Sequence, residues 1–112
     1  MPKPELLDKS IEGISLQKLL QEINRRIIEA GLREKQIGHS YFMGINNLED
    51  LEFTFANEIV PLLQDYFFDD YKKLEEDILS SDFVDSEKML IKDNWKKDSQ
   101  VFLEVLKSTF QA

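Results

Sequence analysis

The feature that most constrains the fold is an apolar stripe with helical spacing between residues 15 and 31. Its apolar side chains recur three and four positions apart and so share one face of an α-helix: Leu16, Leu19, Leu20, Ile23 and Ile27. Ser15 is a suitable N-cap and Gly31 a stop signal, so a helix is predicted between them. The chain has only four glycines and three prolines, which leaves few places to turn and favours long helices.

A second stripe runs from Leu48 to Tyr66, and Asn47 is its expected N-cap. Pro61 lies inside this stripe and removes one backbone hydrogen bond. Because the stripe continues beyond Pro61, we expect the proline to kink the helix rather than end it. A shorter helix is expected from Asp69–Asp70 to residue 78 or 79.

The last third of the chain is harder to interpret. Two short apolar runs, Phe83–Val84 and Met89–Ile91, allow a small β-hairpin. A final helix is expected from residue 98 or 99 to residue 109. We therefore expect an all-α protein, a small helical bundle with a short β-hairpin near residues 83–91. It would comprise an irregular N-terminal segment (1–14), a helical unit (15–79) and a C-terminal extension with the final helix (80–112).

The composition argues against several classes of function. A net charge of −8 disfavours direct DNA binding, because phosphate backbones are bound by Lys and Arg. The absence of cysteine excludes disulfides, thiolate zinc sites and cysteine nucleophiles, and it fits a cytoplasmic protein. No apolar run approaches the ~20 residues that cross a bilayer, so no membrane contact is expected. The N-terminus also lacks the apolar core of a signal peptide.

The sequence also lacks the common catalytic motifs. It contains no glycine-rich loop ending in Gly-Lys-Ser/Thr, and no Gly-x-Ser-x-Gly elbow. The acidic runs Asp69–Asp70 and Glu75–Asp77 have no EF-hand spacing and are typical of a solvated helix face. We therefore predict no catalytic residue, no metal site and no cofactor bound by this chain alone. A metal-dependent enzyme built on the acidic runs remains an alternative.

Two polar pairs are candidates for binding. His39 and Ser40 lie between Gly38 and Gly44, in a segment with more large side chains than a solvated loop carries. One possibility is that the imidazole or the hydroxyl faces a ligand or partner. The other is that His39 is half-buried and caps a helix or bonds to a backbone carbonyl. Arg25 and Arg26 form a compact basic pair. They either reach a phosphate or carboxylate of a partner, or pair with Glu22 or Glu29 on their own helix.

Aromatic side chains supply the candidates for a protein interface: Tyr41, Phe42, Tyr66, Phe67, Phe68 and Tyr71. Three consecutive aromatics cannot all point to one helix stripe, so at least one of residues 66–68 is expected near the surface. Packing in the core is the expected role of the other two.

Three segments, in this order and spacing, resemble the end of the AAA+ domain of the McrB family. The first is Leu16-x-x-Leu19-Leu20-x-x-Ile23-Asn24-x-Arg26-Ile27, and the second and most specific is Ile37-Gly38-His39-Ser40-Tyr41-Phe42-Met43. The third runs from Phe55 through Ile59-Val60-Pro61-Leu62-Leu63-Gln64-Asp65-Tyr66-Phe67 to Asp69-Asp70-Tyr71 and Leu74. The resemblance covers residues 2–79 and implies the C-terminal lid of the AAA+ subunit.

The resemblance implies a function for a longer parent protein. McrB-like proteins are motors driven by GTP or ATP with Mg²⁺; they form ring-shaped hexamers and work with an McrC-type nuclease that cleaves DNA containing modified cytosine. Their nucleotide-binding core lies upstream of the lid, so residues 1–14 would be the junction to a core that this sequence lacks. The chain would then not be an enzyme by itself.

The same resemblance implies roles for particular residues. A lid packs over the nucleotide and contacts the neighbouring subunit of the ring. His39 and Ser40 would be nearest the nucleotide, and Arg25 and Arg26 would face the core or the neighbouring subunit. The alternative is a stand-alone helical protein-interaction module that docks partners on its aromatic side chains.

Overall fold

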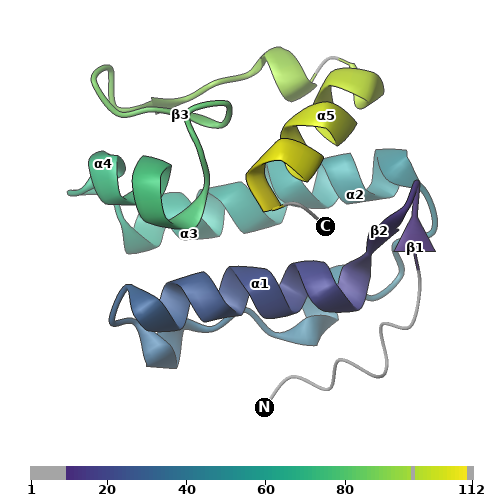
Figure 1. Cartoon of the computed structure of the whole chain (residues 1–112), viewed down its shortest axis with the longest axis horizontal. Coiled ribbons are helices and arrows are strands. Elements are labelled where there is room, and N and C mark those ends of the chain that lie inside the picture. The colour runs from purple at the N-terminus through teal and green to yellow at the C-terminus, as the bar shows by residue number, and fades with distance from the viewer. Residues whose placement is uncertain (1–9, 97, 111–112) are drawn as a thin grey trace.

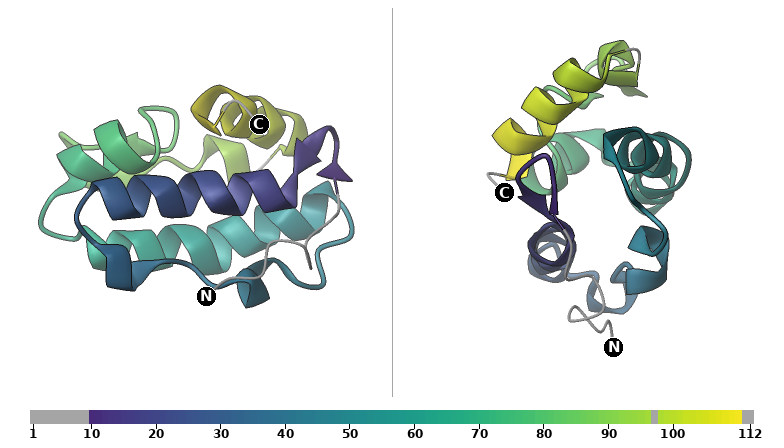
Figure 2. Two further views of the ribbon diagram at one scale, coloured as in Figure 1. Left: turned by 60° about the horizontal axis from the view of Figure 1, so that its bottom comes forward. Right: turned by 90° about the vertical axis from the view of Figure 1, so that its right-hand side faces the viewer.

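Helices surround an apolar core in the computed structural model, which describes residues 10–96 and 98–110 (Figures 1 and 2). The α-helices of this part are α1 (Leu16–Glu29), α2 (Leu48–Thr54), α3 (Val60–Tyr66), α4 (Tyr71–Lys73) and α5 (Ser99–Phe110). Between them lie 3₁₀ helices, namely η2 (Arg33–Lys35), η3 (His39–Phe42) and η6 (Asn94–Lys96). Two further turns are π-helical, η4 (Phe55–Ile59) and η5 (Leu74–Ile78). The predicted all-α class is confirmed.

Helix α1 begins and ends as the sequence predicts. The Ser15 hydroxyl accepts a hydrogen bond from the Lys18 backbone N–H at 3.3 Å, which makes Ser15 the N-cap. At the other end Gly31 has a φ of 89°, in the left-handed region that favours glycine. The N–H of Leu32 then bonds to the carbonyl of Ile27 at 3.1 Å, so the chain turns back sharply after the helix.

Helices α2 and α3 follow one another as one continuous helix with the π-helical turn η4 between them (Figure 1). The Asn47 side chain caps α2 by accepting from the Asp50 N–H at 2.8 Å, as predicted. In η4 the N–H of Val60 reaches back to the carbonyl of Phe55, five residues away. The helix continues through Pro61, as predicted, and the wider turn lies just ahead of the proline, which has no N–H to donate.

The predicted third helix consists of α4 and the second π-helical turn, η5. Asp70 caps it, because its carboxylate accepts from the Lys73 N–H at 3.1 Å. The N–H of Leu79 closes η5 by bonding to the Leu74 carbonyl at 2.8 Å. Leu74 and Ile78 are fully buried, so this short helix is anchored by its inward face.

Two small antiparallel hairpins complete the fold of residues 10–96 and 98–110. Strands β1 (Ser10–Ile11) and β2 (Ile14–Ser15) precede α1, with Glu12 and Gly13 in the turn at φ 51° and 83°. Two consecutive positive φ values are typical of the tight turns that join hairpins. The expectation of an irregular segment over residues 1–14 is therefore wrong for residues 10–14, and residues 1–9 lie outside the described part of the chain.

The second hairpin joins β3 (Val84–Asp85) to β4 (Leu90–Ile91), as the sequence predicts. Val84 pairs with Ile91, and Asp85 pairs with Leu90. The N–H of Ser86 bonds to the Glu75 carboxylate at 3.0 Å, which attaches the hairpin to η5.

An aromatic cluster centred on Phe55 joins the two halves of the chain. The ring centroid of Phe55 lies between 5.6 and 6.4 Å from those of Phe42, Phe83, Phe102 and Phe110. Trp95 is fully buried and packs between Phe83 and Phe102 at 5.2 and 5.7 Å. Residues 80–110 thus contribute to the same core as the helices before them.

A partly buried carboxylate lies where α2 meets the start of α5. One oxygen of Glu52 is buried without a hydrogen-bond partner among the described residues. Burial, reinforced by the negative charges of Glu49 and Asp98, raises the pKa of Glu52 above its ordinary value of 4.5. The folded protein therefore holds this proton more tightly than the unfolded chain. The associated stability is present at low pH and is lost as the pH rises through the folded-state pKa.

Replacing Glu52 with glutamine is expected to raise the melting temperature at pH 7, because the amide carries no charge to desolvate. At pH 4 the gain should shrink, since Glu52 is then largely protonated in the folded protein. Thermal unfolding followed by circular dichroism at both pH values measures the difference. Glu58→Gln, on the exposed side of the same helix, is the matched control. Equal effects of the two substitutions at pH 7 would show that burial of Glu52 is not the cause.

Candidate functional site: the turn after the first helix

The turn that contains His39 and Ser40 lies alongside α1. In Figures 1 and 2 this turn and α5 lie toward opposite ends of the molecule. The N–H of Tyr41 bonds to the Gly38 carbonyl, and the N–H of Met43 bonds to the Ser40 carbonyl, each at 3.3 Å. The predicted short helical turn is therefore a 3₁₀ helix, η3.

Asn24 of α1 attaches the start of this turn to the helix. Its side-chain N–H donates to the Ile37 carbonyl at 2.9 Å, and its side-chain oxygen accepts from the Ile37 N–H at 2.6 Å. Asn24 and Ile37 are only 6% and 1% exposed, so without these two bonds the buried backbone groups of Ile37 would lack partners. Sequence reasoning did not assign this role, although a polar residue beside the buried stripe of α1 was a signal.

The side chains of the turn face in different directions. Phe42 is buried in the core, Tyr41 is half-buried, and Ser40 is exposed. The side chain of His39 lies outside the described part of the structure. The turn is therefore anchored by its aromatic end and presents a hydroxyl group and peptide backbone to solvent near Ser40.

Arg25 and Arg26, the second candidate pair, both form ion pairs within α1. Arg25 Nε donates to the Glu22 carboxylate at 2.9 Å, and the same guanidinium pairs with Glu29 at 2.8 Å. Hydrogen bonds from Arg25, followed by those from Arg26, lower the pKa of Glu22 to about 2. The stability from this pairing is fully present above pH 4.5 and is lost as the pH falls towards 2.

Arg26 also connects α1 to two distant parts of the chain. Its guanidinium donates to the carbonyl of Ile78 at 3.0 Å and to that of Thr109 at 2.8 Å. It also lies over the ring of Phe110, 4.7 Å from the centroid. These carbonyls end η5 and α5, where the helix dipole favours a cation. Arg26 thus joins α1 to the C-terminal part of the fold.

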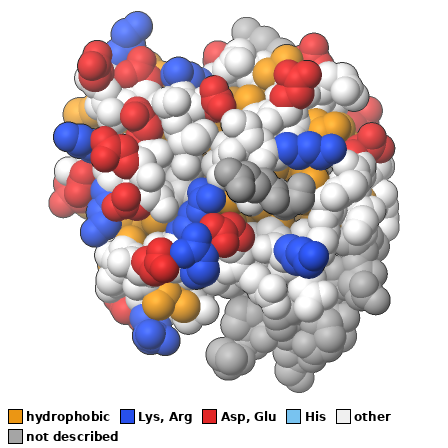
Figure 3. All heavy atoms as spheres, in the orientation of Figure 1, with side chains coloured by type: hydrophobic (Ala, Val, Ile, Leu, Met, Phe, Trp, Pro, Cys, Tyr) orange, Lys and Arg blue, Asp and Glu red, His pale blue; other side chains and the backbone are white. Residues whose placement is uncertain are grey.

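Both arginines line a pocket of about 560 Å³ between α1, η5 and the end of α5. Three acidic side chains, Glu29, Glu76 and Asp77, line it as well. These carboxylates, together with Glu22, outnumber the two guanidinium groups and make the pocket a poor site for a triphosphate. Ser40 is not among the lining residues, so the structure does not bring its hydroxyl together with the two arginines there. Basic and acidic side chains are also interleaved on the face in Figure 3.

The aromatic interface candidates divide into buried and accessible groups. Phe42 and Phe67 are 1% and 3% exposed, so their prediction as interface residues is wrong for this fold: both belong to the core. Tyr41, Tyr66 and Tyr71 are half-buried; the Tyr71 hydroxyl accepts a hydrogen bond from Gln64 at 3.0 Å. Phe68 is 68% exposed and is the most accessible of the candidates.

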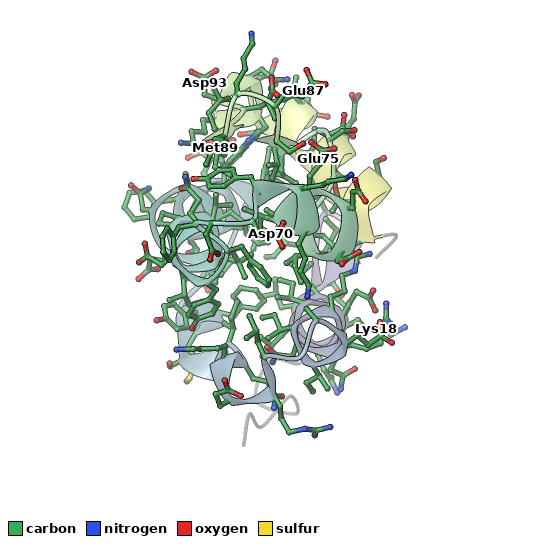
Figure 4. All side chains as sticks on the ribbon, turned by 90° about the vertical axis from the view of Figure 1, so that its left-hand side faces the viewer. Lys18, Asp70, Glu75, Glu87, Met89 and Asp93 are labelled. Atoms are coloured by element: carbon green, nitrogen blue, oxygen red, sulfur yellow. The ribbon has the colours of Figure 1, made fainter. Side chains whose placement is uncertain are left out.

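The acidic residues give no indication of a metal centre. Among residues 10–96 and 98–110, no three His, Cys, Asp or Glu side chains converge as metal ligands would. Figure 4 shows Asp70, Glu75, Glu87 and Asp93 lying apart on different elements. None of the helices described is long and apolar enough to span a membrane.

Comparison with protein families identifies the helical unit. The family described as the McrB alpha-helical lid domain matches residues 15–75, which is 61 of the 112 residues. No curated protein and no solved structure gives a significant match. The matched segment begins at the N-cap of α1 and contains both Asn24 and the turn that it holds. The chain therefore belongs to the family of McrB alpha-helical lid domains.

Proposed function

We propose that this chain is the lid of a McrB-type AAA+ motor and closes over GTP or ATP, with Mg²⁺, bound by a separate core. The observation that carries the proposal is the family match over residues 15–75. The structure supports a mechanical role: the turn bearing Ser40 is fixed to α1 by Asn24 and presents polar groups outward. Such an element moves as a unit with the lid when it closes.

His39 and Ser40 are the residues that we propose to lie nearest the nucleotide. The exposed hydroxyl of Ser40 is a hydrogen-bond donor free to reach a ligand oxygen. Arg25 and Arg26, by contrast, face carboxylates and backbone carbonyls of this chain. We therefore propose that the arginines shape the lid and its contact with the core or a neighbouring subunit, and do not bind phosphate.

The same proposal extends to the assembly. A lid that contacts the next subunit of a hexameric ring transmits the nucleotide state of one subunit to its neighbour. The parent motor would then act with an McrC-type nuclease on DNA containing modified cytosine. The acidity of this chain supports a role away from the DNA itself.

A chimaeric motor tests the proposal. This chain replaces the lid of a McrB-type protein, and hydrolysis of GTP and of ATP is measured with Mg²⁺. We expect the chimaera to hydrolyse nucleotide faster than the same core without a lid. Ser40→Ala and His39→Ala should each reduce the rate about tenfold or more, because a misplaced contact is costly in a closed site.

The control for these variants is Ser108→Ala, an exposed serine of α5 outside the family match. It should leave hydrolysis unchanged, and all three isolated variants should melt like the parent chain. A chimaera no more active than the lidless core would reject the lid function. Unchanged hydrolysis by both His39 and Ser40 variants would reject their placement near the nucleotide.

One observation favours a second function, that of a stand-alone interaction module. Phe53 and Phe68 are 66% and 68% exposed, which is unusual for large apolar side chains. Sedimentation of the isolated chain over a range of concentrations tests self-association. Association that is lost in Phe68→Ser would favour the module over the lid, whereas a monomer at all concentrations would disfavour it.

A further inference from the structure

We infer that the outward face of the continuous helix α2–η4–α3 is a docking surface for a basic amphipathic helix of another protein. The inference goes beyond closure over nucleotide and does not depend on it, because it concerns a protein partner and a different helix. Its support comes from the position of this face in the fold, from an exposed aromatic side chain and from the distribution of charge.

The outward face is a stripe of residues that point away from the core. The buried residues of this helix include Leu51, Phe55, Ile59 and Leu63. Positions two residues from each of these lie on roughly the opposite side of a helix. They form what we call the outer stripe, whose members are exposed except for the half-buried Pro61: Glu49, Phe53, Asn57, Pro61 and Asp65.

No other element of the described chain lies outside this helix in the right-hand view of Figure 2. The helix is at the edge of the molecule there, and both α1 and α5 lie on its inner side. The outer stripe is therefore available to a partner.

Phe53 is the apolar anchor of the outer stripe. Its side chain is 66% exposed, while its neighbours Thr54 and Phe55 are buried. Phe68, just beyond α3, is 68% exposed as well. Exposed rings contribute little to folding, whereas their burial by a partner is favourable. A partner that covers Phe53 therefore needs large apolar side chains of its own.

The region around the outer stripe holds most of the net charge of the protein. Residues 36–71 contain no Lys or Arg, which is the longest such interval in the sequence. In the rest of the chain, acidic and basic residues nearly balance, so most of the net charge of −8 comes from the carboxylates of this interval. There are seven of them: Glu49, Asp50, Glu52, Glu58, Asp65, Asp69 and Asp70.

This charge is not neutralised within the part of the chain that the structure describes. The ion pairs between described side chains all lie within α1. Lys35 lies over the ring of Tyr66 at the end of α3, 5.4 Å from the centroid. A binding partner that supplies Lys or Arg would therefore meet carboxylates that have no ion-pair partner in this fold.

These features specify the chemistry of the partner. The outer stripe is a ridge of about 24 Å at the rise of an α-helix, and helices pack along such ridges. A helix with Lys or Arg beside an apolar face complements both its charge and Phe53. A second copy of this chain would instead bring like charges together. Nucleic acid and anionic membranes would be repelled for the same reason.

A probe peptide tests the inference on the full chain. It is a fluorescein-labelled helical peptide of leucine and lysine with all leucines on one face, and fluorescence anisotropy measures its affinity. Phe53→Ser should weaken binding about tenfold, because it removes the anchor. Asp65→Lys should weaken it about threefold or more and reduce its dependence on salt. A peptide of the same composition with leucines on all faces should bind more weakly than the probe.

Matched controls change the same properties elsewhere on the surface. Met89→Ser removes a side chain that is 59% exposed on the β3–β4 hairpin, and Glu104→Lys makes the same charge change as Asp65→Lys on the exposed side of α5. Both variants should bind the probe like the parent chain. Phe53→Ser should also melt like the parent, since its side chain is largely exposed.

Three results would overturn the inference. The first is unchanged binding in both Phe53→Ser and Asp65→Lys. The second is an equal loss of binding in Glu104→Lys and Asp65→Lys, which would show attraction to the acidic chain as a whole. The third is self-association of the chain that Phe53→Ser abolishes, because a second copy would then cover this face. All of these measurements use the chain alone, so an inactive chimaeric motor would reject the proposed lid function without affecting them.

Discussion

A chain truncated after Leu79 is expected to lose its helical fold, although it keeps every residue that the lid family matches. The removed part supplies large side chains to the core, namely Phe83, Trp95, Phe102 and Phe110. Loss of one such side chain costs about 3–5 kcal/mol, and a whole domain is stable by only about 5–15 kcal/mol. Losing all of them at once should therefore leave residues 1–79 largely unfolded by far-UV circular dichroism.

A matched control removes residues of the same region that lie outside the core. Replacing residues 86–89 with Asn-Gly shortens only the tip of the β3–β4 hairpin, where Met89 is 59% exposed. This variant should melt cooperatively and within a few degrees of the full chain. If residues 1–79 melted as cooperatively and at a similar temperature, the lid would have a core of its own, contrary to our expectation.

Arg26→Ala is expected to destabilise the fold by about 2–3 kcal/mol, because it breaks a partly buried hydrogen-bond network. The side chain is 17% exposed, and its guanidinium bonds to Glu22 and to the carbonyls of Ile78 and Thr109. After the substitution, the carbonyls that end η5 and α5 lose their donor. Urea unfolding followed by tryptophan fluorescence measures the change, since Trp95 is the sole tryptophan and is fully buried.

The neighbouring arginine provides the comparison. Arg25 also pairs with Glu22, but its side chain is 53% exposed and its other partner is the exposed Glu29. Ion pairs of this kind contribute little, so Arg25→Ala should leave the urea midpoint nearly unchanged. Arg26→Lys keeps the charge but loses the planar guanidinium with its several donors. Its urea midpoint should lie between those of Arg25→Ala and Arg26→Ala. Equal effects of Arg25→Ala and Arg26→Ala would show that the long-range bonds of Arg26 are unimportant.

Local features of the fold could be predicted from the sequence because they depend on neighbouring residues. Ser15, Asn47 and Asp70 all cap helices as their residue types and positions indicate. The stripe of α1 is buried throughout, and the hairpin near residues 83–91 forms where two short apolar runs allow it. In each case a few consecutive residues contain the whole signal.

Features that join distant residues could not be predicted. Asn24 bonds to Ile37 across an irregular loop, and Arg26 reaches carbonyls 52 and 83 residues away. Helical periodicity places both residues on α1 but does not show what lies opposite them. The same holds for which aromatic residues are buried and which are exposed. The sequence requires at least one of residues 66–68 to be near the surface, and only the packing shows that it is Phe68.

The π-helical turn η4 has a consequence for how the chain beyond it is oriented. Leu51, Phe55, Ile59 and Leu63 are buried at strict four-residue intervals, which would rotate by about 120° over three steps of an α-helix. The wider turn takes up about one extra residue, or roughly 100°, and so returns Leu63 to the azimuth of Leu51. Deleting one residue between 55 and 59 would therefore restore a regular helix and leave α3 at nearly the same azimuth, whereas an α-helix through all the residues present would swing α3 and all that follows by more than a quarter of a revolution.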